Sequence, residues 1–256
     1  MKIYFYITEP RSLYTLTLLW SLLHCNKYIL LNHPVLLIQC YIHYMPKTKI
    51  IKINSNKPEK EKILKITQSL KKGGIIIFPT DTLYGLGGNA LNKNTVKKIF
   101  RLKKRPTNKA ISINIAYKKD LNKYVKKIPP SAKKLIKEFW PGPLTIIFEK
   151  SDIIPSELTG GSPYIGIRVP NNKITLQIIK EYGLPLTSPS ANLSGKNPPT
   201  TAKEAKKDFL NKVDMIIESD ETTSKQCSTI VDLTKERPLI LREGAIPIKQ
   251  LNKFIK

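Results

Sequence analysis

The chain has 256 residues, enough for one substantial domain or two small ones, and its 44 Lys and Arg against 19 Asp and Glu give a net charge of +25. Such a charge favours anionic partners, either an anionic substrate or a nucleic acid. The lysines are scattered, with no basic arm and no interleaved aromatic residues to stack bases, so we favour compositional drift plus an anionic substrate over a dedicated nucleic-acid surface.

Residues 1–44 differ in character from the rest of the chain. The apolar run 13–23 is interrupted by His24 before it reaches the ~20 residues that a spanning helix needs, and no good signal-peptide cleavage site follows it. Three interpretations stay open: an extension that is not translated, with Met45 as initiator; a membrane anchor; or a genuine soluble extension. We favour the first and expect a folded domain over residues 45–256, in the cytoplasm and without membrane association.

All three histidines and two of the three cysteines precede Met45. The domain 45–256 therefore contains no histidine and one cysteine, Cys227. This composition excludes Ser-His-Asp and Cys-His mechanisms, and zinc sites built on histidine or cysteine pairs. It also argues against a disulfide framework and suits a reducing compartment.

Hydrophobic periodicity and turn residues predict alternating helices and strands after residue 58. The predicted helices are 59–70, 95–102 (capped by Asn92 or Asn94), 131–140 (capped by Ser131), 174–182 (ended by Gly183) and 201–210 (capped by Thr200 or Thr201). The predicted strands are 75–78, 111–116, 144–148, 165–169, 184–187, 214–218, 229–233 and 239–242, and 150–163 is expected to be a surface loop. Several connections are too short for parallel crossovers, so the fold class is α/β (α+β): a twisted open sheet, mixed parallel and antiparallel, with flanking helices.

The stretch 73–90, GGIIIFPTDTLYGLGGNA, joins a buried strand to a cluster of hydroxyls and glycines. Thr80, Asp81, Thr82 and Tyr84 follow the strand's carboxyl end, where open α/β sheets place their ligands. We expect the glycines at 85, 87 and 88 to take positive φ or to let a ligand approach closely. An ordinary strand-to-turn transition explains the residues equally well.

A second loop, SPSANLSGKNPPTTAKEA (188–205), repeats this pattern before a helix, whose N-terminal N–H groups could receive phosphate oxygens. A Ser/Asn-rich turn with a capped helix also explains the residue types, but not why two such loops occur in one chain. No GxxxxGK[ST] or GxGxxG phosphate loop is present. Candidate phosphate ligands are therefore the cations after the helix 95–102, namely Lys103, Lys104, Arg105 and Lys109. The alternative for this cluster is a solvated basic helix end, which the helix dipole favours.

Six segments in one order, PTDTLYGLG, KKRPTNKAISIN, WPGPLT, GIRVP, SPSANLSG and STIVDLT…LREG, resemble the YrdC-like family of L-threonylcarbamoyladenylate synthases over residues 60–246. The resemblance implies a YrdC-like fold of the single-domain type, and no further carboxyl-terminal domain is expected. It also implies conversion of L-threonine, bicarbonate and ATP to threonylcarbamoyl-AMP and diphosphate, with Mg²⁺ held mainly by ATP. The product is the donor for N6-threonylcarbamoyladenosine (t6A) at position 37 of tRNAs reading ANN codons, so the t6A transferase machinery is the implied downstream partner.

The same resemblance implies roles for individual residues. Lys103, Arg105, Ser190 and Asn192 match the catalytic Lys-x-Arg and Ser-x-Asn pairs. L-Threonine would contact Thr82, Asn114, Arg168, Ser190 and Ser228, with Arg168 on its carboxylate. ATP would contact Arg105, Lys109, the segment at Tyr164, Asn192, Thr200 and Arg242. Because Asn114 stands where many relatives have histidine, it is expected to bind substrate without acting as a base.

Two rival functions are compatible with parts of the sequence. A non-catalytic module that binds double-stranded RNA or tRNA would use the net charge alone, with affinity that falls steeply with salt. A carbamoyl-transferring maturation enzyme has a similar fold within a much longer chain rich in zinc-finger-like cysteines. The length and the single cysteine of 45–256 disfavour the second.

Overall fold

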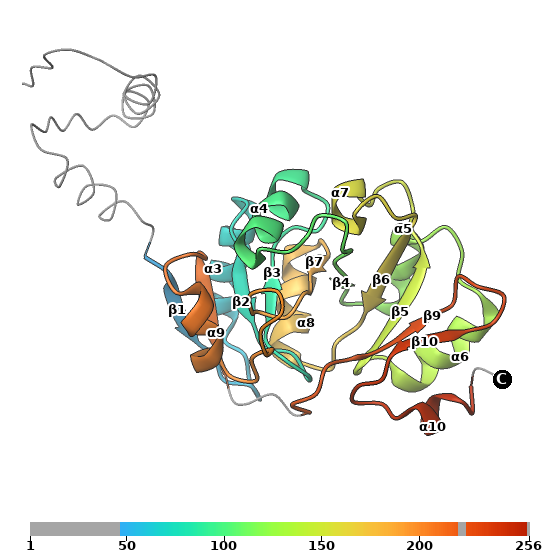
Figure 1. The fold of residues 1–256 in the computed structure, drawn as a ribbon. Helices are drawn as coiled ribbons and strands as arrows, with labels where there is room; N and C mark the ends of the chain where they lie inside the picture. The colour runs from blue at the N-terminus through green and yellow to red at the C-terminus, as the bar shows by residue number, and fades with distance from the viewer. Residues whose placement is uncertain (1–46, 220–223, 255–256) are drawn as a thin grey trace, which may run out of the picture. The chain divides into compact units, whose positions relative to one another are not determined.

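The computed structural model describes residues 47–219 and 224–254. The extension 1–44, with its apolar run and its histidines, lies outside the described residues. Lys47–Lys256 form a compact unit in which helices and strands alternate (Figure 1). Within the described ranges, no helix is long and apolar enough to cross a bilayer.

Every predicted helix and strand is present, with ends within two residues of those expected. The strands are β1 (Lys49–Lys52), β2 (Ile76–Phe78), β3 (Gly85–Gly87), β4 (Ile113–Asn114), β5 (Leu144–Glu149), β6 (Tyr164–Arg168), β7 (Leu186–Thr187), β8 (Met215–Glu218), β9 (Thr229–Asp232) and β10 (Leu239–Arg242). The helices are α3 (Lys60–Lys71), α4 (Lys93–Lys103), the 3₁₀ turn η1 (Lys118–Asp120), α5 (Leu121–Tyr124), α6 (Pro130–Phe139), α7 (Ser156–Thr159), α8 (Lys173–Tyr182), α9 (Ala202–Phe209) and α10 (Ile248–Leu251).

The strands form two mixed sheets, in the orders β1-β8-β2-β3 and β10-β9-β5-β6-β4-β7. Both contain parallel pairs, such as β2 with β8 and β4 with β6, and antiparallel pairs, such as β2 with β3 and β5 with β6. The expected mixed α/β architecture is confirmed, but the strands divide between two sheets where one was expected. Single bridges, Gly85 to Ser190 and Asn89 to Leu186, join the β3 and β7 edges.

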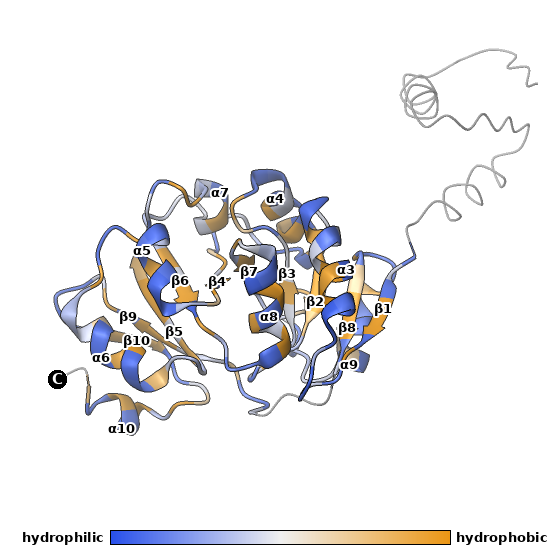
Figure 2. Ribbon diagram, turned by 180° about the vertical axis from the view of Figure 1, so that it is seen from behind, coloured by the Kyte–Doolittle hydropathy of each residue, from blue (hydrophilic) through white to orange (hydrophobic). Residues whose placement is uncertain are grey.

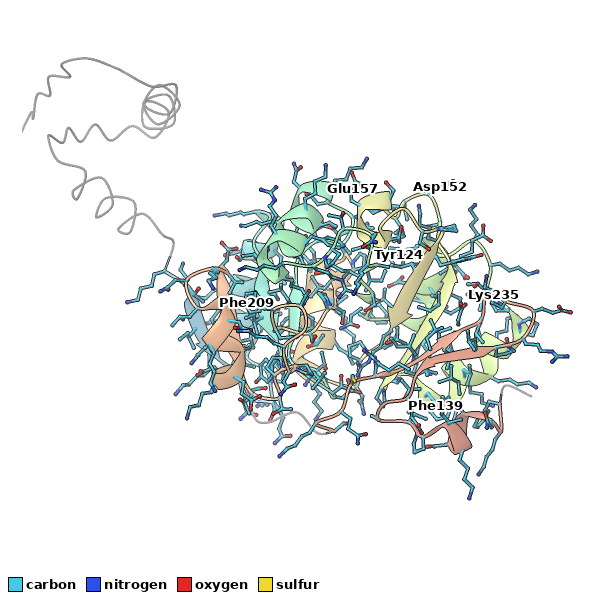
Figure 3. The ribbon with its side chains drawn as sticks, viewed as in Figure 1. Tyr124, Phe139, Asp152, Glu157, Phe209 and Lys235 are labelled. Carbon is cyan, nitrogen blue, oxygen red and sulfur yellow. The ribbon has the colours of Figure 1, made fainter. Side chains whose placement is uncertain are left out.

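In the first sheet, β2, β3 and β8 are buried, whereas the edge strand β1 is mostly exposed. In β2, Ile76 and Phe78 pack with α3 and α8, whereas Ile75, just before the strand, and Ile77 face the larger core, to which Phe209 of α9 belongs (labelled in Figure 3). This alternation follows from the two-residue period of a strand. Figure 2 shows the consequence: the central strands are hydrophobic, while the helices carry both hydrophobic and hydrophilic residues.

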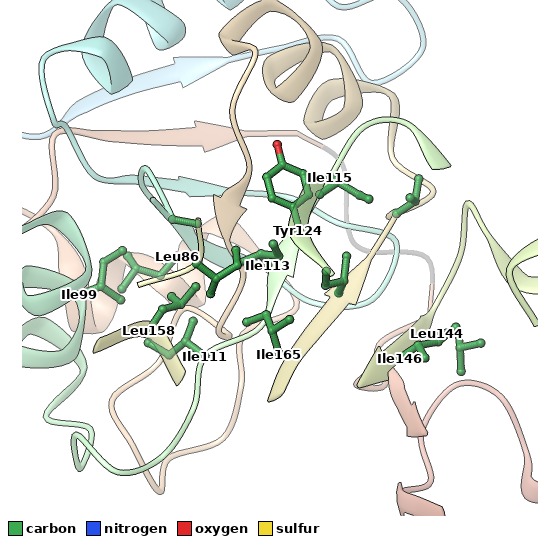
Figure 4. Close-up of a cluster of buried hydrophobic side chains, with 14 of the residues drawn as sticks. Leu86, Ile99, Ile111, Ile113, Ile115, Tyr124, Leu144, Ile146, Leu158 and Ile165 are labelled. Atoms are coloured by element: carbon green, nitrogen blue, oxygen red, sulfur yellow. The ribbon is translucent and has the colours of Figure 1, made fainter. Parts of the chain in front are cut away.

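The second sheet has one apolar face and one mixed face. Leu144, Ile146 and Phe148 of β5 and Ile165 and Ile167 of β6 point into the larger core. Figure 4 shows part of this cluster, including Ile146 and Ile165. The intervening residues of β5 and β6 face the other way, so period-two alternation alone assigns Thr145, Ile147, Gly166 and Arg168 to a common surface.

The helix boundaries show which sequence signals were sufficient. Asn92 caps α4 by accepting a hydrogen bond from Thr95 N at 2.9 Å, and Gly183 ends α8 in the left-handed conformation, as predicted. The predicted cap of α6 by Ser131 is wrong. The helix begins at Pro130, because proline at the first position has no N–H to satisfy and its φ is already helical.

The glycines after β2 have a different role from the one expected. Among the described glycines, positive φ occurs elsewhere and not at residues 85, 87 or 88. Gly85 and Gly87 form β3 and pack flat on the ring of Phe78; a Cβ at Gly87 would lie 2.6 Å from Phe78 Cε1. These glycines therefore permit close packing within the fold, and the prediction of positive φ is corrected.

Candidate functional site

A cleft of about 280 Å³ opens between the mixed face of the second sheet and the loops that follow β2 and β7. The loop after β2 contributes Thr80, Thr82 and Tyr84, as the strand-end position predicted. Seven of the predicted site residues line the cleft: Thr82, Lys103, Arg105, Arg168, Ser190, Ser228 and Arg242. The other five, Asn114, Lys109, Tyr164, Asn192 and Thr200, do not form its walls.

Lys103 is buried at the end of α4. The next residue, Lys104, takes the left-handed conformation (φ 50°) and ends the helix. Lys103 Nζ donates to the backbone oxygens of Ser190 at 2.5 Å and Asn192 at 2.6 Å, which fixes the loop after β7. Burial and, secondarily, the nearby Arg105 charge lower the pKa of Lys103 to about 8, while Asp208 opposes the shift. An ammonium has three N–H donors, so one is left for a ligand.

Arg105 lies two residues after the end of α4. Its Nε donates to Lys109 O at 3.0 Å and its Nη2 to Ala110 O at 2.9 Å, which curls residues 105–110 around the guanidinium. Burial lowers the pKa of Arg105, but an arginine stays charged at neutral pH. Lys109 itself is exposed and lies outside the cleft wall. The structure thus holds Lys103 and Arg105 as two fixed cations on one side of the cleft.

Asn192 acts within the loop. Its Oδ1 accepts from Ser190 Oγ at 2.5 Å, and its Nδ2 donates to Leu193 O at 2.9 Å and Lys196 O at 2.6 Å. With its amide occupied in this way, Asn192 orients the hydroxyl of Ser190, which lines the cleft. The Ser-x-Asn pair therefore presents one side chain to a ligand and uses the other to position it.

Arg168 ends β6 at the floor of the cleft. It is held by three partners: Gly142 O at 2.9 Å, Thr82 Oγ1 at 2.8 Å and Asp81 Oδ1 at 2.5 Å. Burial lowers the pKa of Arg168, and the Asp81 carboxylate opposes this shift. In the sequence Asp81 is recognisable only as a strand-end residue, because its pairing with Arg168 across 87 positions has no local signal.

Arg242 ends β10 and binds Ser228, which immediately precedes the neighbouring strand β9. Its Nε and Nη2 donate to Ser228 O at 3.0 and 2.8 Å, and Nη2 also reaches Ser228 Oγ at 3.1 Å. Thr145 Oγ1 lies 2.9 Å from Ser228 Oγ and also lines the cleft. Thr145 was not predicted as a site residue, although its position between two core residues of β5 places it on the cleft face.

Asn114 is fully buried, and its side-chain amide makes no hydrogen bond with the described residues. Neither Oδ1 nor Nδ2 has a partner among the described residues. In the β4–β6 pairing Asn114 lies opposite Arg168, and Ser112, two residues earlier, lines the cleft, so Asn114 belongs to the cleft face. Buried amides are nearly always bonded, so the two unbonded atoms of Asn114 mark an unsatisfied polar position beside Arg168.

Two predicted ATP contacts, Tyr164 and Thr200, do not line the cleft. Tyr164 begins β6, and Lys235 Nζ, on the β9–β10 connection, lies 5.8 Å from its ring centroid (Lys235 is labelled in Figure 3). Thr200 donates from N and Oγ1 to Glu204 Oε2, at 2.7 and 3.2 Å. Because Glu204 also closes a capping box with Thr201, it occupies N–H groups at the start of α9. These bonds engage the N–H groups of Thr200 and Thr201, just before α9, and the phosphate site at this helix start stays a prediction.

The comparisons with known proteins place this geometry in a family. A family model for Sua5, YciO and YrdC proteins, described as "Telomere recombination", matches residues 68–244. The chain is 42% identical over 186 residues to "Threonylcarbamoyl-AMP synthase" of Pyrococcus abyssi, which covers 73% of this chain and 55% of that relative. It is also 42% identical over 208 residues to "Putative threonylcarbamoyl-AMP synthase" of Methanocaldococcus jannaschii, covering 80% and 97%.

A solved structure agrees with the sequence relatives. The fold matches "Crystal structure of P. abyssi Sua5 complexed with L-threonine" with a TM-score of 0.79 and 40% identity, over 81% of this chain and 61% of that one. The chain therefore spans little more than half the length of the Pyrococcus protein and almost all of the Methanocaldococcus relative.

Burial of Lys103 predicts a pH-dependent stability difference. Its pKa is about 8 in the folded protein against 10.5 ordinarily, so between these values the unfolded chain binds more protons and stability rises with pH. Relative to Lys103→Met, the wild-type free energy of unfolding should gain up to about 3 kcal/mol from pH 7 to pH 10.5. Urea denaturation across this pH range measures the difference in unfolding free energy between the wild type and Lys103→Met. Lys98→Met, at an exposed site on α4, is the control. A difference that does not change with pH contradicts the prediction.

The unbonded amide of Asn114 predicts that its removal stabilises the protein. Asn114→Leu keeps the branched shape of the side chain and removes two unsatisfied polar atoms, so the free energy of unfolding should rise by about 1 kcal/mol. Asn192→Leu is the matched comparison, because its bonded amide is also buried, and it should destabilise the protein. Thermal and urea unfolding of both variants test this, and equal destabilisation would show that Asn114 is bonded in the folded protein.

Proposed function

Because the chain belongs to the Sua5/YciO/YrdC family, we propose that it is a threonylcarbamoyl-AMP synthase, a nucleotidyltransferase that converts L-threonine, bicarbonate and ATP to threonylcarbamoyl-AMP and diphosphate. The observation that carries the proposal is the convergence of four cations and several hydroxyls on one cleft, without a histidine anywhere in residues 45–256. Such a set suits chemistry between anions, in which the protein aligns and neutralises charge without forming a covalent intermediate.

The cleft offers two adjacent halves for the two substrates. Thr82 and Arg168 line the cleft floor and suit an amino acid, with the guanidinium toward its carboxylate, and Asn114 is buried beside Arg168 on the neighbouring strand. Lys103 and Arg105, held at the opposite wall by backbone carbonyls, suit a triphosphate. The P. abyssi Sua5 structure is a complex with L-threonine, which supports the first half of this assignment.

The reaction follows from these charges. The threonine nitrogen attacks the carbon of bicarbonate, and loss of water gives a carbamate. A carbamate oxygen then attacks the α-phosphorus of ATP, the bond to the bridging oxygen breaks, and diphosphate leaves. Both the nucleophile and the electrophile are anionic. The fixed cations Lys103, Arg105 and Arg242 would therefore lower the barrier by stabilising the negative charge that develops on the leaving group.

Magnesium is a further component of the proposed reaction. Asp81, the carboxylate nearest the floor, is engaged with Arg168, and no cluster of three or more Asp, Glu, His or Cys side chains occurs within 47–219 and 224–254. We propose that Mg²⁺ enters on the phosphates of ATP, where it would neutralise their charge. Lys103 and Arg105 would then need to align only the phosphate groups.

The wider assignments follow from the proposed reaction. The catalytic domain spans residues 45–256, and the product passes to the t6A transferase machinery that modifies tRNAs reading ANN codons. That chemistry belongs to the cytoplasm, and Cys227, the free cysteine of the described residues, suits a reducing compartment. Direct contact with tRNA or double-stranded RNA is the rival role that the following assay also tests.

Diphosphate release is the test of the proposed function. The full chain and residues 45–256 should each release diphosphate from ATP and bicarbonate when L-threonine is present, and much less with L-serine or without an amino acid. A folded protein that binds ATP but releases none contradicts the proposal. A protein that binds RNA with a steep salt dependence, but not ATP, would support the RNA-binding role in its place.

Arg105→Gln tests whether the wall cations act on the reaction. Loss of one fixed donor should lower kcat by about 100-fold, equivalent to ~3 kcal/mol, and leave the unfolding temperature nearly unchanged. Arg101→Gln is the matched control, because Arg101 lies on α4, four residues before Arg105, but is exposed and outside the cleft. Equal kcat values for the two variants would remove Arg105 from the mechanism.

A further inference from the structure

Asp81 stands out among the acidic residues because its carboxylate is buried against the cleft floor. It lies in the turn after β2, and its side chain is 9% exposed, while that of Arg168 is 6% exposed. The two are joined at 2.5 Å. Two charges withdrawn from water need good geometry and further hydrogen bonds to remain ionised. Here the further bonds join Arg168 to Gly142 O and to Thr82 Oγ1, and Thr82 lines the cleft.

The first bonds fix the guanidinium. Besides the Nη2 bond to Asp81, Arg168 Nε donates to Gly142 O and Nη1 donates to Thr82 Oγ1, so three of its five N–H groups are committed. Two N–H groups remain, one on each Nη. With the plane of the guanidinium set by three partners, these two donors have a fixed direction at the cleft floor.

The next bond involves the hydroxyl of Thr82. The neighbouring Thr80 Oγ1 gives its single proton to Leu83 O at 2.7 Å and accepts from the backbone N–H groups of Thr82 and Leu83, both at 3.1 Å, so its hydrogen-bonding capacity is already used. Thr82 Oγ1 accepts from Arg168 Nη1 at 2.8 Å, which leaves it one lone pair. Because Thr82 lines the cleft, this lone pair makes it an acceptor toward a ligand.

We propose that Asp81 is a positioning residue of the site: it fixes Arg168, and through Arg168 it sets Thr82 as an acceptor for the amino group of the substrate. The inference rests on the proposed function and deepens it. An acceptor on one amine N–H orients the nitrogen, whose own lone pair then points at bicarbonate. The remaining Arg168 donors take the carboxylate of the same amino acid.

The carboxylate also determines which anions the floor attracts. With Asp81 present, the positive charge of Arg168 is balanced by a carboxylate. Arg168 then attracts a ligand mainly through its directed N–H donors and little through net charge. Asp81→Asn removes the countercharge, so Arg168 becomes an unpaired buried cation that favours any small anion, including inorganic phosphate. Asp81→Glu keeps the ion pair but lengthens the side chain by one methylene, so the guanidinium must move relative to Thr82.

The test is steady-state kinetics on the full chain, with diphosphate release as readout. Asp81→Asn should raise the KM for L-threonine about tenfold or more and leave the KM for ATP within about twofold, since only the amino-acid half is disturbed. Inorganic phosphate should inhibit this variant competitively with L-threonine more strongly than it inhibits the wild type. Asp81→Glu, which retains the ion pair and hence the fold, should show an intermediate rise in the same KM.

Asp232→Asn is the control, because Asp232 is another buried carboxylate, bonded to Thr234 and outside the cleft. It should leave both KM values unchanged. Folded Asp81 variants with a wild-type KM for L-threonine, or with equal rises in both KM values, overturn the inference while the proposed function stands. A wild-type protein without threonine-dependent release overturns the proposed function itself.

Discussion

The burial of positive charge is the constraint on which the site depends. Lys103 and Arg168 are both nearly inaccessible, and each is kept ionised by partners drawn from distant segments: the carbonyls of 190 and 192 for the lysine, and Asp81 for the arginine. A buried cation without such partners would be neutralised or expelled. The two loops after β2 and β7 are therefore parts of one electrostatic arrangement, and the fold must bring them together before either cation is tolerated.

The sheet provides the surface that these loops enclose. Alternation along β5 and β6 gives one face to the hydrophobic core and the other to the cleft, so the same strands stabilise the fold and present Thr145 and Arg168 to a ligand. Gly166 belongs to the cleft face, where an added Cβ would lie 3.2 Å from atoms of Ser112, Thr145 and Ile147. The absence of a side chain at Gly166 therefore leaves space within the cleft.

Much of this could be predicted from the sequence, because periodicity and caps are local signals. Every expected helix and strand is present, and the wall residues Lys103 and Arg105 lie where the motifs placed them. Three features could not be predicted. The division into two sheets depends on strand order, the pairing of Asp81 with Arg168 spans 87 positions, and the glycines of β3 are explained by the ring of Phe78. Each is a tertiary contact without a local signature.

The central claim is that one cleft joins an amino acid, bicarbonate and a nucleotide. Mass spectrometry of the reaction with ¹³C-bicarbonate tests it most directly, because the carbamate carbon can come only from that substrate. We expect an adenylate that contains threonine and gains the mass of one labelled carbon, and that is absent when bicarbonate is removed. Diphosphate release with an unlabelled adenylate, or with threonyl-AMP as the product, would contradict the claim.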